Sequence, residues 1–479
     1  MQTPSLTSTN LDARSAIATA AVVGAIAGAA VLGLASVVAP TAAVAGPLGI
    51  IFVAVAFRNL AAGVALFTVV IFFQNIPGVA APGLGFIKVF GAVLLLAALS
   101  RRGRPVLFRD RPALAYTIAF FASWALASTL WAVDSSAAEG SIVRLVLSVT
   151  LVYVIFAAVE EPRHVRLVVT GYITGALLTA FFGLAKTSPE SANESVNRLA
   201  GGIGDPNFLG AMLVPAVALS CFGLAAFSRP VVRWLLMVCV AVFSLSLFLT
   251  QSRGGLVALG VMFVAAIALA GPVRRQAFAM ILTISAIGLV YFTLVAPPQA
   301  LHRITHFAAG GGAGRTDLWS VATHVIHDHP LLGVGASNFR VVEPTYASGT
   351  VNLTNVNVVV DSPHAVHNTY LEVLAELGSV GLVAFAAVVV ASVGVAFRSL
   401  RAFARDGKWE LEMLTRGLMV GIFGVLGGVT FVSAEFEKQL WLLLGLAAAL
   451  SSLADSRRTP AEAQRVTASG GFLARSEIL

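Results

Sequence analysis

Charged side chains are scarce in this sequence: Asp, Glu, Lys and Arg together make up 11% of its 479 residues. Soluble globular proteins carry about 25% charged residues, so this chain cannot cover a water-facing surface. The hydrophobic residues that take their place reach 58%. The sequence therefore predicts an all-α, polytopic membrane protein.

Cysteine is rare as well. The two cysteines, Cys221 and Cys239, both lie in apolar runs, which argues against a disulfide framework or a thiolate metal site. The sequence contains no phosphate-binding loop, no dinucleotide fingerprint and no nucleotide-binding domain. ATP-driven transport by this chain is therefore disfavoured. The net charge of +8 indicates membrane topology rather than binding to nucleic acid.

Apolar runs recur along the chain at about the 17–25 residues that a bilayer requires. We expect fourteen transmembrane helices, or twelve if the short pair within 43–74 is re-entrant. The expected spans are 15–39, 43–57, 59–74, 86–100, 113–131, 141–158, 165–186, 207–227, 232–250, 255–271, 277–296, 368–397, 415–434 and 440–454.

Lys and Arg are concentrated in alternate loops. With fourteen spans, the basic clusters around 101–111, 229–233, 274–275 and 398–408 all fall on one side of the membrane. Basic loops face the cytoplasm, so both termini are predicted to be cytoplasmic. Three basic residues near the outer ends of spans count mildly against this arrangement: Lys88, Arg144 and Lys186.

One connection is much longer than the others. Residues 297–367 are expected on the outer face and contain seven of the eight histidines. A loop of this length is usually functional, and histidine exchanges protons near neutral pH. Within it, Arg315–His329 is predicted to be an amphipathic helix at the membrane interface, ended by Pro330. Ser362 and Pro363 are expected to start the next helix.

Two arginines are candidates for an anion site. Arg253 lies in an outer turn beside Gly254 and Gly255, and Arg315 begins the amphipathic helix. The simpler interpretations are a snorkelling Arg253 and an Arg315 paired with Asp317. If the two arginines converge, their guanidinium groups can neutralise a diphosphate.

His367 is the candidate general base. It is expected at the outer end of a span, with His364 on the same helical face and Glu372 and Glu376 one and two turns further on. The simpler interpretation is a polar residue at a helix end. His364 lies close enough in sequence to be the base instead.

Two other polar groups are weaker candidates. Three histidines and Asp328 lie within 324–329, but ligands so crowded on one helix rarely face a single metal ion. We therefore expect no metal site there. Asp205-Pro206-Asn207 predicts a turn and a helix start. A substrate contact at that turn stays open.

Four motifs in a fixed order carry a resemblance to a known family. They are Gln251-Ser252-Arg253-Gly254, Gly314-Arg315-Thr316-Asp317-Leu318-Trp319, Asp328-His329-Pro330-Leu331-Leu332-Gly333-Val334-Gly335, and His367-Asn368-Thr369-Tyr370-Leu371 with Glu376-Leu377-Gly378. Together, over roughly residues 195–385, they resemble the O-antigen ligase and O-antigen polymerase superfamily of bacterial envelope glycosyltransferases.

This resemblance implies a membrane glycosyltransferase of the GT-C type in the bacterial cytoplasmic (inner) membrane. Its donor would be a glycan on undecaprenyl diphosphate, and its acceptor a sugar hydroxyl of lipopolysaccharide core or of another lipid-linked repeat unit. Other members of this superfamily, which also serves exopolysaccharide synthesis, attach teichuronic-type or capsular glycans or glycosylate proteins. The motifs imply that Arg253 and Arg315 hold the diphosphate and that His367 activates the acceptor. Neither a metal ion nor a cofactor is implied, and attack opposite the diphosphate would invert the anomeric centre.

The expected organisation follows from these features. We expect an N-terminal bundle over 1–206, a catalytic region over 207–397 that includes the outer loop 297–367, further helices over 398–454, and a disordered cytoplasmic tail over 455–479. The alternative function is a flippase or transporter of lipid-linked saccharides. A transporter favours ionisable groups at the bilayer midplane, whereas here they cluster at the outer ends of helices.

Overall fold

The structure, a computed structural model, describes residues 40–75, 85–101, 103–185, 198–305, 314–349, 353 and 364–455. All regular structure in these ranges is helical, and they contain no strand. This confirms the all-α prediction for the part of the chain that the structure describes.

Thirteen helices of this part form the apolar bundle or its edge. They are α2 (Pro40–Arg58), α3 (Leu60–Val70), α4 (Phe86–Leu99), α6 (Pro112–Ala127), α7 (Ser135–Ala158), α8 (Pro162–Ala185), α9 (Pro206–Ala226), α10 (Pro230–Leu249), α11 (Arg253–Leu269), α12 (Arg274–Val290), α17 (Thr369–Arg405), α18 (Trp409–Gly428) and α19 (Lys438–Asp455). A short helix α5 (Leu107–Asp110) precedes α6, and α18 continues as a 3-10 turn, η6 (Val429–Phe431).

Eight helices within the described ranges are long and apolar enough to cross a membrane. Four shorter apolar helices accompany them: Gly46–Arg58, Leu60–Phe73, Phe86–Leu99 and Arg253–Leu269. The chain is therefore a multi-pass membrane protein. The expected span 15–39 lies outside the described residues, and the count of twelve to fourteen spans stays a prediction.

Three helices extend at least six residues further than their apolar runs. α17 continues to Arg405 instead of ending at 397, α18 begins at Trp409 instead of 415, and α7 begins at Ser135 instead of 141. The extra residues include arginines and glutamates, which a hydropathy criterion excludes from a span although they are good helix formers. The apolar run therefore marks the membrane-buried part of each helix and underestimates the helix itself.

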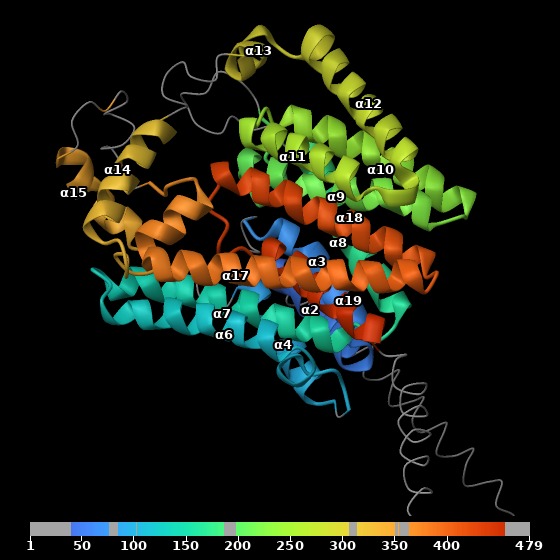
Figure 1. The fold of residues 1–479 in the computed structure, drawn as a ribbon, viewed down its shortest axis with the longest axis horizontal. Coiled ribbons are helices and arrows are strands. Elements are labelled where there is room, and N and C mark those ends of the chain that lie inside the picture. Colours follow the sequence, from blue (N-terminus) through green and yellow to red (C-terminus); the bar gives the residue numbers. More distant parts are fainter. Residues whose placement is uncertain are drawn as a thin grey trace, which may run out of the picture.

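The long helix α17 crosses the whole bundle (Figure 1). It packs against α6, α18 and α19, while α9 lies in contact with α10, α11 and α18. Glycines let α18 approach α9 closely: a Cβ atom on Gly421 would lie 2.9 Å from Cα of Pro215. Small residues of this kind permit the tight backbone contacts on which helix packing in membranes depends.

The regular backbone of α17 is interrupted at Gly378, whose φ of 68° and ψ of −173° only glycine adopts readily. The segment 330–339 crosses the helix there, and a Cβ atom on Gly378 would lie 2.0 Å from the carbonyl oxygen of Leu331. The backbone N–H of Ser379 donates to the carbonyl of Pro330 (2.9 Å), and that of Gly335 donates to the carbonyl of Glu376 (2.8 Å). The kink therefore belongs to a backbone crossing that leaves no room for a side chain.

The same segment also reaches the opposite helices α6 and α7. The amide of Ala336 donates to Oγ of Ser128 (3.0 Å), and the side chain of Asn338 exchanges hydrogen bonds with the backbone of Asp134 (2.6 and 3.0 Å). Residues 330–339 thus tie three helices of the bundle together at one end.

Three helices lie between α12 and α17: α13 (Pro298–Thr305), α14 (Arg315–Asp328) and α15 (Phe339–Gly349). Figure 1 shows α14 and α15 over the beginning of α17. The amphipathic helix is confirmed, and it ends just before Pro330 as predicted. Its apolar residues pack with Val334, Phe339 and Val366 in a small second core. The apolar face of α14 is therefore buried against other parts of the protein.

The predicted start of α17 is wrong. The helix begins at Thr369 with Asn368 as its N-cap, and residues 364–366 are not helical. Ser362 and Pro363 lie outside the described residues. The side chain of Asn368 accepts hydrogen bonds from the amides of Tyr370 and Leu371 (3.0 and 3.2 Å). Because this amide side chain satisfies the first free N–H groups, the helix needs no earlier start.

Candidate functional site

Phe431, at the end of η6, lies where three helix starts meet. A Cβ atom on Gly254 of α11 would lie 2.7 Å from Cβ of Phe431, so the Phe431 side chain packs directly against the backbone of Gly254. The Arg315 guanidinium of α14 lies over the Phe431 ring, 6.0 Å from its centroid. Next to Phe431, Val432 accepts hydrogen bonds from the amide and hydroxyl of Thr369, the first residue of α17 (3.1 and 2.7 Å). The starts of α11, α14 and α17 are therefore brought together.

The turn before α11 is shaped to end one helix and begin the next. Gln251 adopts a left-handed φ of 49°, and Oγ of Ser252 caps α11 by accepting from the amide of Gly255 (3.0 Å). Arg253 is then the first residue of the helix, half-buried, with Gly254 against Phe431. The turn lies between two helices, as the sequence predicts, and it places a guanidinium at a helix N-terminus, where anions are favoured.

Arg315 holds the matching position on α14. Gly314, with φ of 80°, provides the turn into the helix, and Arg315 is half-buried. One turn further on, the indole of Trp319 packs near Phe431, with ring centroids 6.1 Å apart. Its Nε1 donates to the carbonyl of Val366 (3.1 Å), directly before His367. Trp319 therefore connects the start of α14 to the segment that carries the histidine.

His367 lies two residues before α17, in a left-handed backbone conformation with φ of 53°. It is therefore not on the first turn of the helix, and it does not share a helical face with His364. A non-glycine residue in this conformation is uncommon, and such residues are concentrated at functional sites. After His367, the turn is held by the cap of Asn368 and by the Thr369–Val432 contacts; before it, Trp319 holds the carbonyl of Val366.

The surroundings of His367 keep its imidazole neutral. Desolvation by burial lowers the pKa of His367 most, and the positive charges of Arg315, Arg340 and His364 lower it further, whereas Asp205 opposes them; the resulting pKa is about 4. Arg315 is thus close enough to His367 for its charge to lower the pKa of the imidazole. Arg340, which is exposed on α15, is a cation that the sequence interpretation did not single out.

The two carboxylates that follow His367 in sequence do not face it. Glu372 is buried and accepts a hydrogen bond from the hydroxyl of Ser433. Glu376 is buried and accepts from the amides of Ser337 and Phe339 (2.6 and 3.3 Å). The negative charge that acts on His367 is instead Asp205, far away in sequence. Glu376 anchors the crossing segment 330–339.

Asp205 begins α9, as its motif predicts. Its carboxylate caps the helix by accepting from the amides of Asn207 and Phe208 (2.6 and 3.0 Å). Arg198 is buried beside it, donating to the carbonyl of Thr250 (3.0 Å) and to Oδ1 of Asn207 (2.9 Å). Arg198 therefore stabilises the turn that carries Arg253. The spacing of the motifs does not indicate this role.

The crowded histidines at the other end of α14 are exposed and lie with different partners. His324 interacts with the carbonyl of Ser320 (2.8 Å), and His327 with Asp328 (3.2 Å). Asp328 also accepts a hydrogen bond from the hydroxyl of Tyr346 (3.0 Å). Among the described residues, no group of three or more His, Cys, Asp or Glu side chains could hold a metal ion.

Phe431 is the main residue that the sequence interpretation missed. It ends an apolar span, where a phenylalanine resembles any lipid-facing residue, so hydropathy gives no signal for it. Its importance depends on the helix starts that surround it.

The fold and this site together define a multi-pass, all-helical membrane protein with two half-buried arginines at helix starts and a neutral histidine at one end of its bundle. Residues 235–386, from within α10 to the first half of α17, match the family described as O-Antigen ligase. The resemblance recognised in the motifs is thereby confirmed, and Arg253, Arg315 and His367 all lie inside the matched segment. No relative among curated proteins matches this chain.

Proposed function

We propose that this protein is a membrane glycosyltransferase that transfers a glycan from undecaprenyl diphosphate to an acceptor sugar hydroxyl at the outer face of the cytoplasmic membrane. The match to the O-antigen ligase family supports the reaction class. The observation that carries the assignment of residues is the meeting of three helix starts at Phe431, with Arg253, Arg315 and His367 at or next to those starts.

The donor diphosphate is assigned to the two arginines. Guanidinium groups engage phosphate oxygens through pairs of parallel hydrogen bonds. The N-terminus of α11 adds the backbone N–H groups and positive helix dipole that favour an anion. Fixed positive charges of this kind stabilise the negative charge that develops on the leaving diphosphate.

In the proposed transfer, the acceptor hydroxyl oxygen bonds to the anomeric carbon of the donor while His367 takes the hydroxyl proton. The bond between that carbon and the diphosphate oxygen breaks, and its electron pair stays on the lipid diphosphate. Attack from the face opposite the diphosphate inverts the anomeric centre. The residues account for charge and proton without a metal ion or a cofactor.

Donor binding would also adjust the base. With a pKa of about 4, the imidazole of His367 is neutral but weakly basic in the absence of substrate. A diphosphate bound to Arg315 would offset one of the positive charges that lower this pKa. The basicity of His367 would then rise towards the range where general bases are most effective, so that the base is activated only when the donor is in place.

A transporter of lipid-linked saccharides is the less favoured function. The half-buried cations and the histidine lie at helix starts, not in the middle of helices. Ionisable groups in that position suit chemistry at a membrane surface better than passage through its centre.

The decisive experiment is an analysis of envelope glycans in a strain that lacks this protein, complemented with the wild-type chain or with Arg253→Ala, Arg315→Ala or His367→Ala. Single lipid-linked repeat units that accumulate outside would identify a polymerase, and long unattached chains would identify a ligase. Lipid-linked glycan trapped on the cytoplasmic side would instead identify a transporter and contradict the proposal. Membrane levels of each variant provide the control for folding.

A further inference from the structure

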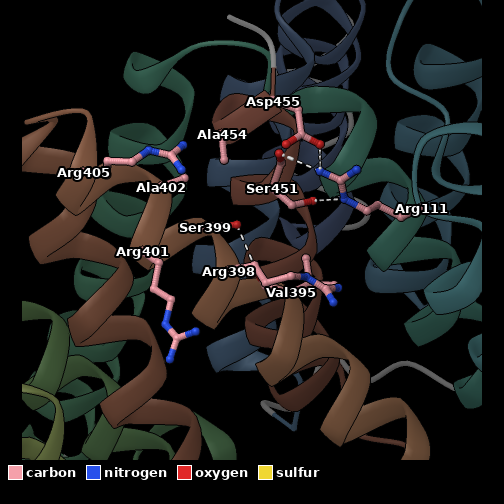
Figure 2. Close-up of a pocket in the computed structure, with 10 residues that line it drawn as sticks. All are labelled: Arg111, Val395, Arg398, Ser399, Arg401, Ala402, Arg405, Ser451, Ala454 and Asp455. Atoms are coloured by element: carbon pink, nitrogen blue, oxygen red, sulfur yellow. Dashed lines mark hydrogen bonds and ion pairs between the residues drawn. The ribbon is translucent and has the colours of Figure 1, made fainter. Parts of the chain in front are cut away.

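The opposite end of α17 carries a second polar site. A hollow of about 420 Å³ opens there between α17, α19 and the beginning of α6, and four arginines contribute to its lining. Figure 2 shows the hollow, with Arg111 reaching from α6 to α19 and the other arginines fanned along α17. These are Arg398, Arg401 and Arg405, and the acidic residue of the lining is Asp455.

Arg111 is held in place. Its Nε donates to Oγ of Ser451 (2.7 Å), and a terminal nitrogen donates to the Ser451 carbonyl (2.8 Å) and pairs with Asp455. Its side chain is 22% exposed. One guanidinium group of the hollow is therefore fixed and partly desolvated before any ligand binds.

The arginines of α17 lie three and four residues apart, at positions 398, 401 and 405. This spacing places like charges on one helix face, which is unfavourable unless an anion compensates them. Arg401 stacks on Phe397, with its guanidinium carbon 4.4 Å from the ring centroid, and Arg405 lies 3.4 Å from Asp406. The lining contains four arginines and the carboxylate of Asp455, and Asp406 at its edge pairs with Arg405, so the hollow keeps a net positive charge.

Position and lining indicate the ligand. Arg398 lies 20 residues beyond the kink at Gly378, or about 30 Å at about 1.5 Å per residue, which matches the roughly 30 Å core of a bilayer. The hollow therefore lies at the membrane boundary opposite the candidate active site. Val395, Ala402 and Ala454 give it an apolar wall, which suits a ligand with an anionic head and an apolar body.

We propose that this arginine hollow binds a phosphate group, separately from the glycan substrates. Basic pockets between helices at a membrane boundary suit anionic lipid headgroups, and guanidinium groups match phosphate oxygens. Either a phospholipid headgroup or a soluble phosphate supplies this chemistry, and the experiment distinguishes the two.

The test is the unfolding temperature of the purified full-length protein in a neutral detergent. Dioctanoyl phosphatidylglycerol, dioctanoyl phosphatidylcholine and inorganic phosphate are titrated separately, because a ligand that binds only the folded state raises the unfolding temperature. The test variant is Arg398→Gln, Arg401→Gln and Arg405→Gln together. The matched control is Arg229→Gln, Arg233→Gln and Arg275→Gln, which removes the same charge from exposed positions.

The control arginines 229 and 233 lie at the same end of the bundle, because Nε1 of Trp409 in α18 donates to the carbonyl of Ala225 in α9 (2.7 Å). We expect phosphatidylglycerol to stabilise the wild type and the control, and to bind the test variant at least about tenfold more weakly. Phosphatidylcholine should have no effect. Inorganic phosphate that reproduces the same pattern would support the site and identify a soluble phosphate as its ligand.

Equal stabilisation of the two triple variants would overturn the proposal, and so would a wild type that neither phosphatidylglycerol nor inorganic phosphate stabilises more than phosphatidylcholine does. If the test variant does not fold, Arg398→Gln is compared with Arg229→Gln in the same titrations. A single charge removed from the hollow should still weaken phosphatidylglycerol binding more than one removed outside it.

Discussion

The two ends of α17 differ in the regularity of their backbone and in the burial of their polar side chains. At its beginning, the backbone is irregular: His367 has a left-handed φ, Gly378 interrupts the helix, and the polar side chains are buried with specific partners. At its end, the helix is regular as far as Arg405, and its cations are exposed around an open hollow. Irregular backbone fixes a few groups for chemistry, whereas regular helix with flexible arginines suits a ligand held mainly by charge.

The comparison implies that the two ends of α17 lie on opposite sides of the membrane. Labelling from outside the cell should therefore occur at one end and be absent at the other. In a background without Cys221 and Cys239, a membrane-impermeant thiol reagent added outside intact cells should label His327→Cys on α14. It should label Arg401→Cys on α17 only after the membrane is opened. The reverse pattern would invert the proposed orientation.

Removal of the histidine should have the largest effect on rate. His367→Ala is expected to lower turnover by about 10²–10⁴-fold, the usual contribution of a general base, while donor binding is retained because both arginines remain. The matched control is His327→Ala, an exposed histidine outside the site, which should keep normal turnover. His364→Ala should be milder than His367→Ala; the opposite ranking would make His364 the base.

Glycine-to-alanine changes in the two halves of α17 should have different effects on stability and activity. Gly378→Ala forces a side chain into a left-handed conformation that costs about 1–3 kcal/mol and into contact with the Leu331 carbonyl. It should lower the unfolding temperature and activity together. Gly394→Ala meets no atom within 4 Å and should change stability by no more than about 1 kcal/mol, in the favourable direction. Equal effects would show that the kink is dispensable.

The pH dependence of kcat/KM should reveal the neutral histidine. With a pKa of about 4, His367 is unprotonated in the free enzyme well below its ordinary value of 6.5. Activity should therefore fall only near pH 4 on the acid side, provided that the protein remains folded. Because Arg340 lowers this pKa, Arg340→Gln should move the acid limb slightly upward, and an unchanged limb would remove Arg340 from the site.

The free energy of unfolding should also depend on the protonation of His367. The folded pKa of His367 lies below its ordinary value, so the unfolded chain binds the proton first as the pH falls. His367 should therefore have no effect on stability above about pH 6.5, should lower stability progressively as the pH falls from about 6.5 to 4, and should leave the full loss in place below pH 4. A comparison of wild type and His367→Ala by thermal unfolding across these pH values measures this contribution.

Helices and motifs were largely accessible from the sequence. Apolar runs identified the described bundle helices, the amphipathic helix 315–328 was found from its periodicity, and Asp205 was recognised as the start of α9. The start of α17 was misplaced because Ser362-Pro363 and Asn368 are both good beginnings for a helix by local chemistry. The contacts of Thr369 with Val432 and Ala434 favour the later one.

The sequence by itself determined that this is an all-α membrane protein and which residues carry its polar chemistry, because composition and periodicity are local properties of the chain. Only the tertiary structure decided which of these residues meet. Phe431 brings together the starts of α11, α14 and α17. Asp205, far away in sequence, raises the pKa of His367, and Arg111 lines the same hollow as the arginines of α17. These meetings depend on the packing of helices distant in sequence, which no local pattern encodes.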